Sequence, residues 1–370
     1  MAELSLRPNY PPNAANGGID AGRVECDAIL AEMEWRIRKE YEQAAAEMRK
    51  KAEEYLAWFE EEDKRMQKLV AQGKMTQQEY TNWRLSHIAQ GRRWYEMAEV
   101  LASDLNAANV IAAEIVNGYM PEVFAVGYNT ALYQGELTSG FSTSFTLYDR
   151  DTVIRLISEY PDLLPIKAHI DNVKDIEWNK KQLASAITQG ILQGETMQEI
   201  ADRLINSSIA QNENVAMRNA RTAVTSAENG GRYEGYRRLK RAGADMTIEW
   251  CATLDGRTRH THRILDGQRQ DVDVPFEVDG YKILYAGDPR AAQGLIWNCR
   301  CTMLAWVKSF ENDPDLKLQT RPDGMTYTEW KHAKEAEYEA AKERKAEKER
   351  QRARINPDNP SYGYATDIEV

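Results

Sequence analysis

A run of apolar residues at steps of three or four, between Ile29 and Phe59, most constrains what this chain can fold into. Such steps keep side chains on one face of an α-helix, and the residues between them are mostly Glu, Lys and Arg. The pattern continues to Val70 and stops at Gly73, a residue suited to the left-handed position after a helix. A long amphipathic helix is therefore predicted, with a buried face made of Ile29, Met33, Ile37, Tyr41, Ala44, Met48, Ala52, Tyr55 and Phe59.

A second helix is predicted to begin at Thr76, because Thr76 and Glu79 form the T-x-x-E pattern of a capping box. It should reach about Asn117, where Asn-Gly changes the pattern. Two long helices joined by a short turn form an antiparallel hairpin, which we place at residues 23–120.

Beyond the hairpin, shorter pieces predict a mostly helical middle region at residues 121–245, with a helix over 121–137 and a strand over 141–149. From Met246 the pattern alternates as in β-strands, and Asp279-Gly280 is a hairpin turn signal.

The predicted fold class is α+β: a long N-terminal helical hairpin and a helical middle region, a small mixed α/β terminal domain, and a charged C-terminal helix. The small α+β domain is expected at residues 246–310. The remaining ranges are a disordered arm at 1–22, a linker and charged helix at 311–355, and a disordered tail at 356–370.

The formal net charge of −10 argues against a general nucleic-acid coat, so any contact with DNA needs a local basic patch. No apolar run approaches the roughly 18 residues needed to span a bilayer, and the N-terminus lacks the apolar core of a secretory signal. The four cysteines are too few and scattered for a disulfide scaffold, so we expect folding in a reducing cytoplasm and no membrane partner.

One basic window stands out, at residues 216–241, with seven Arg or Lys against two Glu. It can be a solvated helix face, or it can contact DNA phosphates or an acidic partner. Its cations are Arg218, Arg221, Arg232, Arg237, Arg238, Lys240 and Arg241.

The motif Cys299-Arg300-Cys301 places two of the four cysteines in three positions. A structural zinc site needs about four N or S ligands, which His262, Cys299, Cys301 and either His260 or Cys251 could supply. The same sulfurs would point to one face if they lie on a strand. Two alternatives stay open: buried thiols with His262 hydrogen-bonded to the loop, and a disulfide involving Cys251.

Residues 250–301 form an ordered signature: "WCATLDGRTRHTHRILDGQ", then "PF", then "YAGDP", then "NCRC". It resembles the phage-Mu-F-like minor head proteins of tailed bacteriophages, also called phage head morphogenesis proteins. The resemblance covers about residues 215–307 and includes the upstream "RT…NGGR" at 221–232. Its signature residues are Trp250, Asp255, Arg257, Thr258, Arg259, His262, Asp266, Gly267, Asn298, Cys299, Arg300 and Cys301.

This sequence departs from the pattern of that family at a few positions. Many relatives carry cysteines where this chain has Arg259 and His262, and a proline is common where it has Ala286. Because Cys and His exchange as zinc ligands, the first departure makes a metal site more plausible.

The resemblance implies a minor capsid protein bound at the portal vertex, acting in head morphogenesis and in DNA packaging or ejection. It implies the portal protein as partner, with the major capsid or scaffold protein and viral DNA as further candidates. The location implied is the interior of the virion head, after assembly in the host cytoplasm.

An enzyme is not expected, and no catalytic residue is assigned. The sequence has no G-x-x-x-x-G-K-[ST] loop, no G-x-S-x-G elbow and no H-E-x-x-H motif. We expect Asp255 to cap the helix that follows it, and the signature arginines to bridge to acids such as Asp266 or Asp288. The alternatives are a nuclease or an ADP-ribosyltransferase-like toxin built on the terminal domain, and a scaffold-like assembly factor.

Overall fold

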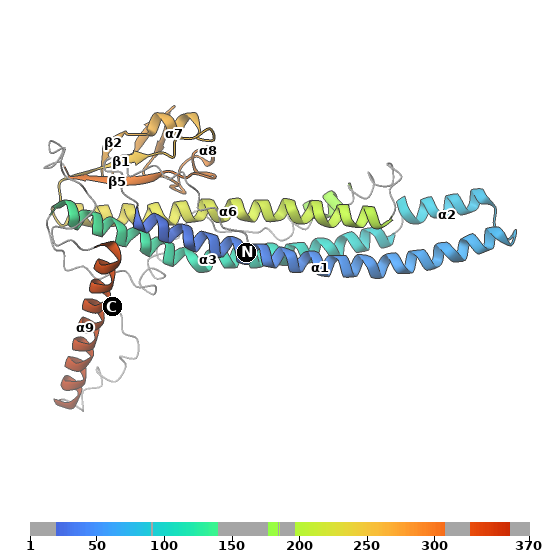
Figure 1. The fold of residues 1–370 in the computed structure, drawn as a ribbon, viewed down its shortest axis with the longest axis horizontal. Coiled ribbons are helices and arrows are strands. Elements are labelled where there is room, and N and C mark those ends of the chain that lie inside the picture. The colour runs from blue at the N-terminus through green and yellow to red at the C-terminus, as the bar shows by residue number, and fades with distance from the viewer. Residues whose placement is uncertain are drawn as a thin grey trace. The chain divides into compact units, whose positions relative to one another are not determined.

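The computed structural model describes residues 20–89, 92–139, 177–183, 185, 197–307 and 326–355 (Figure 1). Its helices include α1 (Ala21–Ala71), α2 (Gln77–Ala89), α3 (Arg92–Ser139), α6 (Met197–Arg241), α7 (His260–Leu265), α8 (Gln293–Ile296) and α9 (Tyr327–Ile355). The strands are β1 (Met246–Cys251), β2 (Arg269–Asp271), β3 (Phe276–Val278), β4 (Tyr281–Ile283) and β5 (Thr302–Val307). Long helices with a few short antiparallel strands confirm the predicted α+β class.

The described residues belong to two compact units. Of the described residues, unit 1 contains those within 20–30, 119–139, 221–307 and 326–355, and unit 2 contains those within 31–118 and 177–220. Since α1, α3 and α6 each contribute to both units, the units combine segments that are distant in sequence. The domain ranges given above remain a prediction.

Unit 2 is held together by the apolar face of α1 that the periodicity predicts. Met33, Ile37 and Met48 are fully buried there. A few polar links lie beside this face: the Tyr41 hydroxyl donates to Asn109 Oδ1 over 2.5 Å, and Asn109 Nδ2 donates to Asn212 Oδ1 over 2.9 Å. The side chains of Tyr55 and Phe59 lie outside the described residues.

The predicted capping box at the start of α2 is confirmed. The Thr76 amide donates to Glu79 Oε2 over 2.7 Å, and the Glu79 amide donates to Thr76 Oγ1 over 3.2 Å. Gly73 takes the expected left-handed conformation, with φ of 68°.

The expected helix end near Asn117 is wrong, because α3 continues through Gly118 and Pro121 to Ser139. A proline inside a helix removes one backbone hydrogen bond. Burial after the proline offsets that loss, since Val123 and Phe124 are fully buried. The strand expected at 141–149 lies outside the described residues.

The segment Glu99–Glu136 of α3 qualifies as a membrane span by length and composition alone, with a mean hydropathy of 1.2 over its best 18 residues. That differs from the expectation drawn from the sequence. The segment also has the marks of a core helix in a folded protein, because Asn129, Thr130 and Glu136 are buried on it and Glu136 accepts a hydrogen bond from Trp330.

Unit 1 contains a three-stranded antiparallel sheet in the order β2-β1-β5, and a β3-β4 hairpin. The hairpin turns at Asp279 and Gly280, with φ of 49° and 79°, as the Asp-Gly signal predicts. Trp250 on β1 is fully buried and meets Phe276 edge to face, with ring centroids 5.6 Å apart.

The second half of α6 lies against this sheet region and against α3. The Tyr236 hydroxyl donates to the backbone oxygen of Met303 over 3.2 Å. On the α3 side the contact is so close that a Cβ on Gly231 would lie 2.1 Å from the Phe124 carbonyl oxygen. Only glycine permits this approach of the two backbones.

The charged helix α9 begins with a second capping box, in which the Thr326 amide donates to Glu329 over 2.8 Å. Its first turns are buried: Trp330 Nε1 donates to Glu136 on α3 over 2.8 Å, and Lys334 Nζ lies 3.4 Å from the same carboxylate. α9 is therefore tied to unit 1 at its start.

Candidate metal centre

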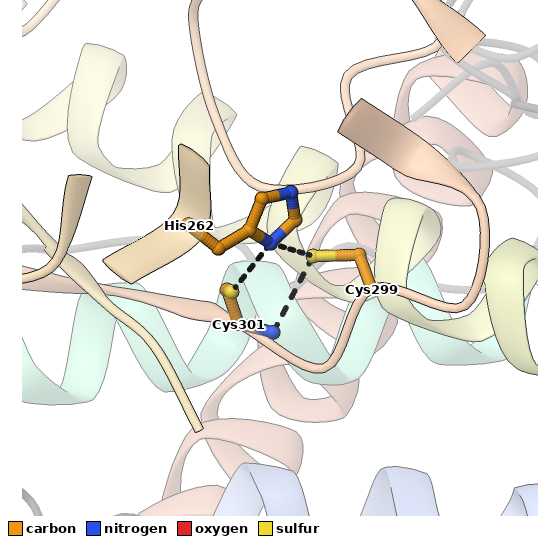
Figure 2. Close-up of side chains that lie close together, drawn as sticks. All are labelled: His262, Cys299 and Cys301. Atoms are coloured by element: carbon orange, nitrogen blue, oxygen red, sulfur yellow. Dashed lines mark hydrogen bonds between the residues drawn. The ribbon is translucent and has the colours of Figure 1, made fainter. Parts of the chain in front are cut away.

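Three side chains that the sequence singles out converge in unit 1 (Figure 2). His262 Nδ1 lies 3.2 Å from Cys301 Sγ and 3.7 Å from Cys299 Sγ. All three side chains are buried, and their ligand atoms lie within 4.8 Å of one another. His262 comes from α7, and the cysteines come from the segment between α8 and β5.

The other two predicted ligands do not join this cluster. His260 is exposed at the start of α7. Cys251 is buried but follows Trp250 on β1, and the Trp250 ring meets the His262 ring at 5.8 Å between centroids. Because successive side chains of a strand point to opposite faces, Cys251 points away from His262.

Two possibilities that the sequence left open for the cysteines do not hold. All four are free thiols, so no disulfide involves Cys251. Cys299 and Cys301 precede β5 instead of lying on it. The chain reverses through the left-handed Asn298, with φ of 51°, and this turn brings both sulfurs to the imidazole.

The two thiols differ in acidity. Hydrogen bonds from Cys301 and His262 hold the pKa of the Cys299 thiol well below its ordinary value, against the effect of burial. The hydrogen bond to Cys299, together with burial, raises the pKa of Cys301 well above its ordinary value.

A ladder of polar side chains on α6 holds the backbone of this segment. Thr222 Oγ1 accepts from the Asn298 amide over 3.0 Å, and the Thr225 hydroxyl donates to the Cys299 carbonyl over 2.7 Å. Asn229 Nδ2 donates to the Cys301 carbonyl over 3.0 Å. The role of this ladder was not predicted from the sequence, although uncharged polar residues at helical spacing could have indicated it.

Asp255 and Arg300 form the second part of the signature. Arg300 donates two hydrogen bonds, of 2.6 and 2.8 Å, to the two carboxylate oxygens of Asp255. Asp255 also accepts from the Arg257 amide over 2.8 Å. The hydrogen bonds from Arg300 and from this amide hold the pKa of Asp255 well below its usual range. The carboxylate thus fixes two loops that lie far apart in sequence.

These contacts replace those expected from the sequence. Asp255 does not cap α7, whose N-cap residue is Arg259 without a side-chain hydrogen bond. Arg259 donates to the carbonyl of Trp297, and Asp266 accepts from the Ala252 amide over 2.7 Å. The Trp297 carbonyl and the Ala252 amide each need a hydrogen-bond partner, and the side chains of Arg259 and Asp266 provide these partners.

The remaining signature residues also serve local structure. The Thr258 hydroxyl donates to the carbonyl of Thr253. The Gly267 amide donates to the carbonyl of Trp250 over 2.8 Å, and Gly267 has φ of 75°, which favours glycine. Arg257 faces solvent, with a side chain 81% exposed.

The basic window of α6 is less available than its composition suggests. Arg232 is fully buried, so its predicted contact with DNA or a partner is wrong. Arg237 pairs with Glu234 and Asp273, each at 2.8 Å, and Lys240 Nζ donates to the carbonyl of Val272 over 2.7 Å. Arg218, Arg221 and Arg238 lie at least partly exposed on the same helix, and Arg241 lies 3.7 Å from Glu234.

Arg232 belongs to a buried charge cluster at the start of α1. It lies 2.7 Å from Asp20 and 3.1 Å from Glu228, and Arg23 lies 2.5 Å from Glu228. Burial raises the pKa of Asp20, but the charge and hydrogen bond of Arg232, together with the amide and charge of Arg23, outweigh it and leave the pKa lowered. The cluster joins the first turn of α1 to α6. No sequence motif predicts this cluster.

Residues 181–304 match the model of the family described as Phage Mu protein F like protein. That range contains the whole signature and the α6 ladder. Residues 181–304 are a Phage Mu F-like region. The resemblance seen in the sequence is thereby confirmed.

Two curated relatives extend the similarity beyond the Mu F-like region. Minor head protein GP7 of Bacillus phage SPP1 is 24% identical over 255 residues, which cover 64% of this chain and 78% of that protein. The NAD(+)–arginine ADP-ribosyltransferase EFV of Enterococcus faecalis is 26% identical over 250 residues. The chain spans about half the length of this second relative, since the match covers 48% of it. No solved structure matches this chain significantly.

Chemically, the Mu F-like region offers a metal-ligand set and a network of internal hydrogen bonds. Cys299 and Cys301 are each about 2% exposed, too little for their sulfurs to attack a bulky substrate. Many of its polar side chains, among them Asp255, Arg300 and Asp266, are hydrogen-bonded to backbone groups or to one another.

Proposed function

We propose that this chain is a minor head protein that acts in phage head morphogenesis at the portal vertex. The observation that carries the proposal is the structural role of the signature residues. Asp255 and Arg300 bind each other, and Asp266 accepts from the Ala252 amide, so these polar groups stabilise the fold. Similarity to a phage minor head protein over most of that protein's length points the same way. On this proposal the protein resides in the virion head, after assembly in the host cytoplasm.

The partner we propose is the portal protein, contacted through the helical part at residues 23–240. That part presents large apolar side chains to solvent, including Trp35, which is 58% exposed on α1. Exposed tryptophans are frequent anchors of protein interfaces. Contacts with the major capsid or scaffold protein belong to the same proposal.

A protein partner is favoured over DNA. Arg232 is buried, and Arg237 and Lys240 already engage groups of the fold. The window therefore offers fewer phosphate contacts than its seven cations suggest. A role in DNA packaging or ejection would then act through the portal.

The test is co-purification of the full chain with the portal oligomer, followed by measurement of the ratio of the two proteins. We expect a stable complex that Trp35→Ala weakens. Tyr281→Ala is the matched control, because Tyr281 is a similarly exposed aromatic, 52%, on β4. Absence of a complex, or equal weakening by both substitutions, would contradict the proposed contact.

The alternative function is the ADP-ribosyltransferase activity after which the Enterococcus faecalis relative is named. The match covers 48% of that protein, so its activity can reside in the part that this chain does not match. We expect no consumption of NAD⁺ by the purified chain, with or without an arginine-containing acceptor. Measurable NAD⁺ turnover would favour the enzyme over the structural protein.

A further inference from the structure

The convergence of His262, Cys299 and Cys301 is not explained by portal binding. We propose that His262 Nδ1, Cys299 Sγ and Cys301 Sγ bind one Zn²⁺ ion, whose fourth position is completed by water. The proposal does not rest on the function proposed above. It rests on donor type, distances and burial of the cluster.

The distances suit a tetrahedral ion. With Zn–S near 2.3 Å and Zn–N near 2.0–2.1 Å, the edges of a tetrahedron are about 3.6 Å for N···S and about 3.8 Å for S···S. His262 Nδ1 lies 3.2 Å from Cys301 Sγ and 3.7 Å from Cys299 Sγ. Both N···S distances lie within a few tenths of an ångström of the expected edge, and the two sulfurs lie within 4.8 Å of each other.

The donor set selects the class of metal. Two thiolates and one imidazole are ligands for zinc and other soft or borderline metals, whereas magnesium and calcium prefer oxygen. Two thiolates also balance the charge of a divalent ion, which is needed where each sulfur is about 2% exposed.

The site is preformed by the rest of the fold. Thr225 and Asn229 on α6 bind the carbonyls of Cys299 and Cys301, and this fixes the backbone from which both sulfurs project. The His262 ring presents Nδ1 to the sulfurs, while its Nε2 has no hydrogen-bond partner among the described residues. The two sulfurs therefore provide the polar contacts that orient this buried ring.

The ion would join two segments that lie far apart in sequence. His262 lies on α7, and the cysteines lie directly before β5. Among the described residues, the metal-ligand group contains these three members, and we assign the fourth position to water. A tie of this kind stabilises a small sheet region because the ion binds the folded chain and not the unfolded one.

The experiment uses the full chain, purified under reducing conditions, stripped with a chelator and titrated with Zn²⁺ and with Co²⁺. We expect about one zinc per chain and a higher Tm with zinc than without it. Cobalt should give intense visible bands of tetrahedral geometry and a thiolate-to-metal charge-transfer band in the near ultraviolet. No bound zinc, or cobalt spectra without thiolate bands, would overturn the proposal.

Variants separate the ligands from their neighbours. Cys299→Ser and Cys301→Ser should each lower zinc binding sharply, whereas Cys251→Ser and His260→Gln should leave it unchanged. His262→Cys replaces one ligand by another and should retain zinc, which keeps the test valid if the serine variants fold poorly. Loss of zinc in Cys251→Ser, or full retention in Cys301→Ser, would contradict the assigned ligands.

Discussion

The two compact units bury different kinds of side chain. Unit 2 buries an apolar stripe of α1 and leaves its charges at the surface, as in the exposed pair of Arg36 with Glu32 at 2.7 Å. Unit 1 also buries charged side chains, among them Arg232 and Glu228, both fully buried, whereas the polar side chains buried in the described part of unit 2, such as Asn179 and Asn212, are uncharged. An apolar stripe tolerates many sequences, whereas buried polar groups need particular partners. Unit 1 should therefore respond far more strongly to single polar substitutions.

The largest effect is expected for Arg232→Met. It leaves Asp20 and Glu228 without the cation they share, and removing one partner of a buried ion pair costs about 3–5 kcal/mol. The matched substitution in unit 2 is Arg36→Met, where an exposed pair contributes at most about 0.5 kcal/mol. Urea unfolding measures the loss of unfolding free energy in each variant. Similar losses in the two variants would contradict the difference between the two units.

Gly231→Ala should cost somewhat less, on the order of 3 kcal/mol, because the added Cβ forces α6 and α3 apart. Its ideal position is 2.1 Å from the Phe124 carbonyl oxygen. Gly118→Ala on α3 is the control, since nothing lies within 4 Å of a Cβ there. That change should stabilise by roughly 0.5–1 kcal/mol through helix propensity. Equal outcomes would mean that the α3–α6 contact is looser than described.

Asp255→Asn should lower the Tm at neutral pH and weaken the dependence of the Tm on pH in the acidic range. The folded-state pKa of Asp255 is lowered by Arg300, so its contribution is complete above the unfolded pKa of about 3.9 and is lost as pH falls below it. Thermal unfolding between pH 7 and pH 3 measures this. The difference between wild type and variant should shrink towards low pH, and a constant difference would argue against the Asp255–Arg300 pair.

The smallest effect is expected in unit 2 for Thr76→Ala, about 1 kcal/mol, because it removes one capping hydrogen bond at the start of α2. Circular dichroism during urea unfolding gives the value. Thr81→Ala is a control in the same helix, since its hydroxyl donates to the Gln77 carbonyl and caps nothing. A loss as large as that of Arg232→Met would place the critical polar contacts in unit 2 as well.

The difference between the buried side chains of the two units also explains which features the sequence could predict. The period of three to four residues located the buried face of α1, and local rules located the Thr76 capping box and the Asp279-Gly280 turn. The continuation of α3 through Pro121 was missed because tertiary burial outweighed a local helix breaker.

In the candidate site, the sequence brought forward His262, Cys299 and Cys301 but also His260 and Cys251, which the structure places elsewhere. The choice depends on the strand face that Cys251 occupies, on the exposed position of His260 and on the left-handed Asn298. The Thr225 and Asn229 contacts, more than seventy residues apart in the chain, follow no local rule. The contact of Arg232 with Asp20, 212 residues away in the chain, could not be predicted for the same reason.

The central claim is that this chain is a low-copy structural component of phage heads. Quantitative mass spectrometry of purified heads, with the portal and major capsid proteins as internal references, tests it most directly. The account predicts that the chain is present in heads at a fixed ratio to the portal protein and far below the major capsid protein. Absence from purified heads, or abundance that follows the major capsid protein, would contradict it.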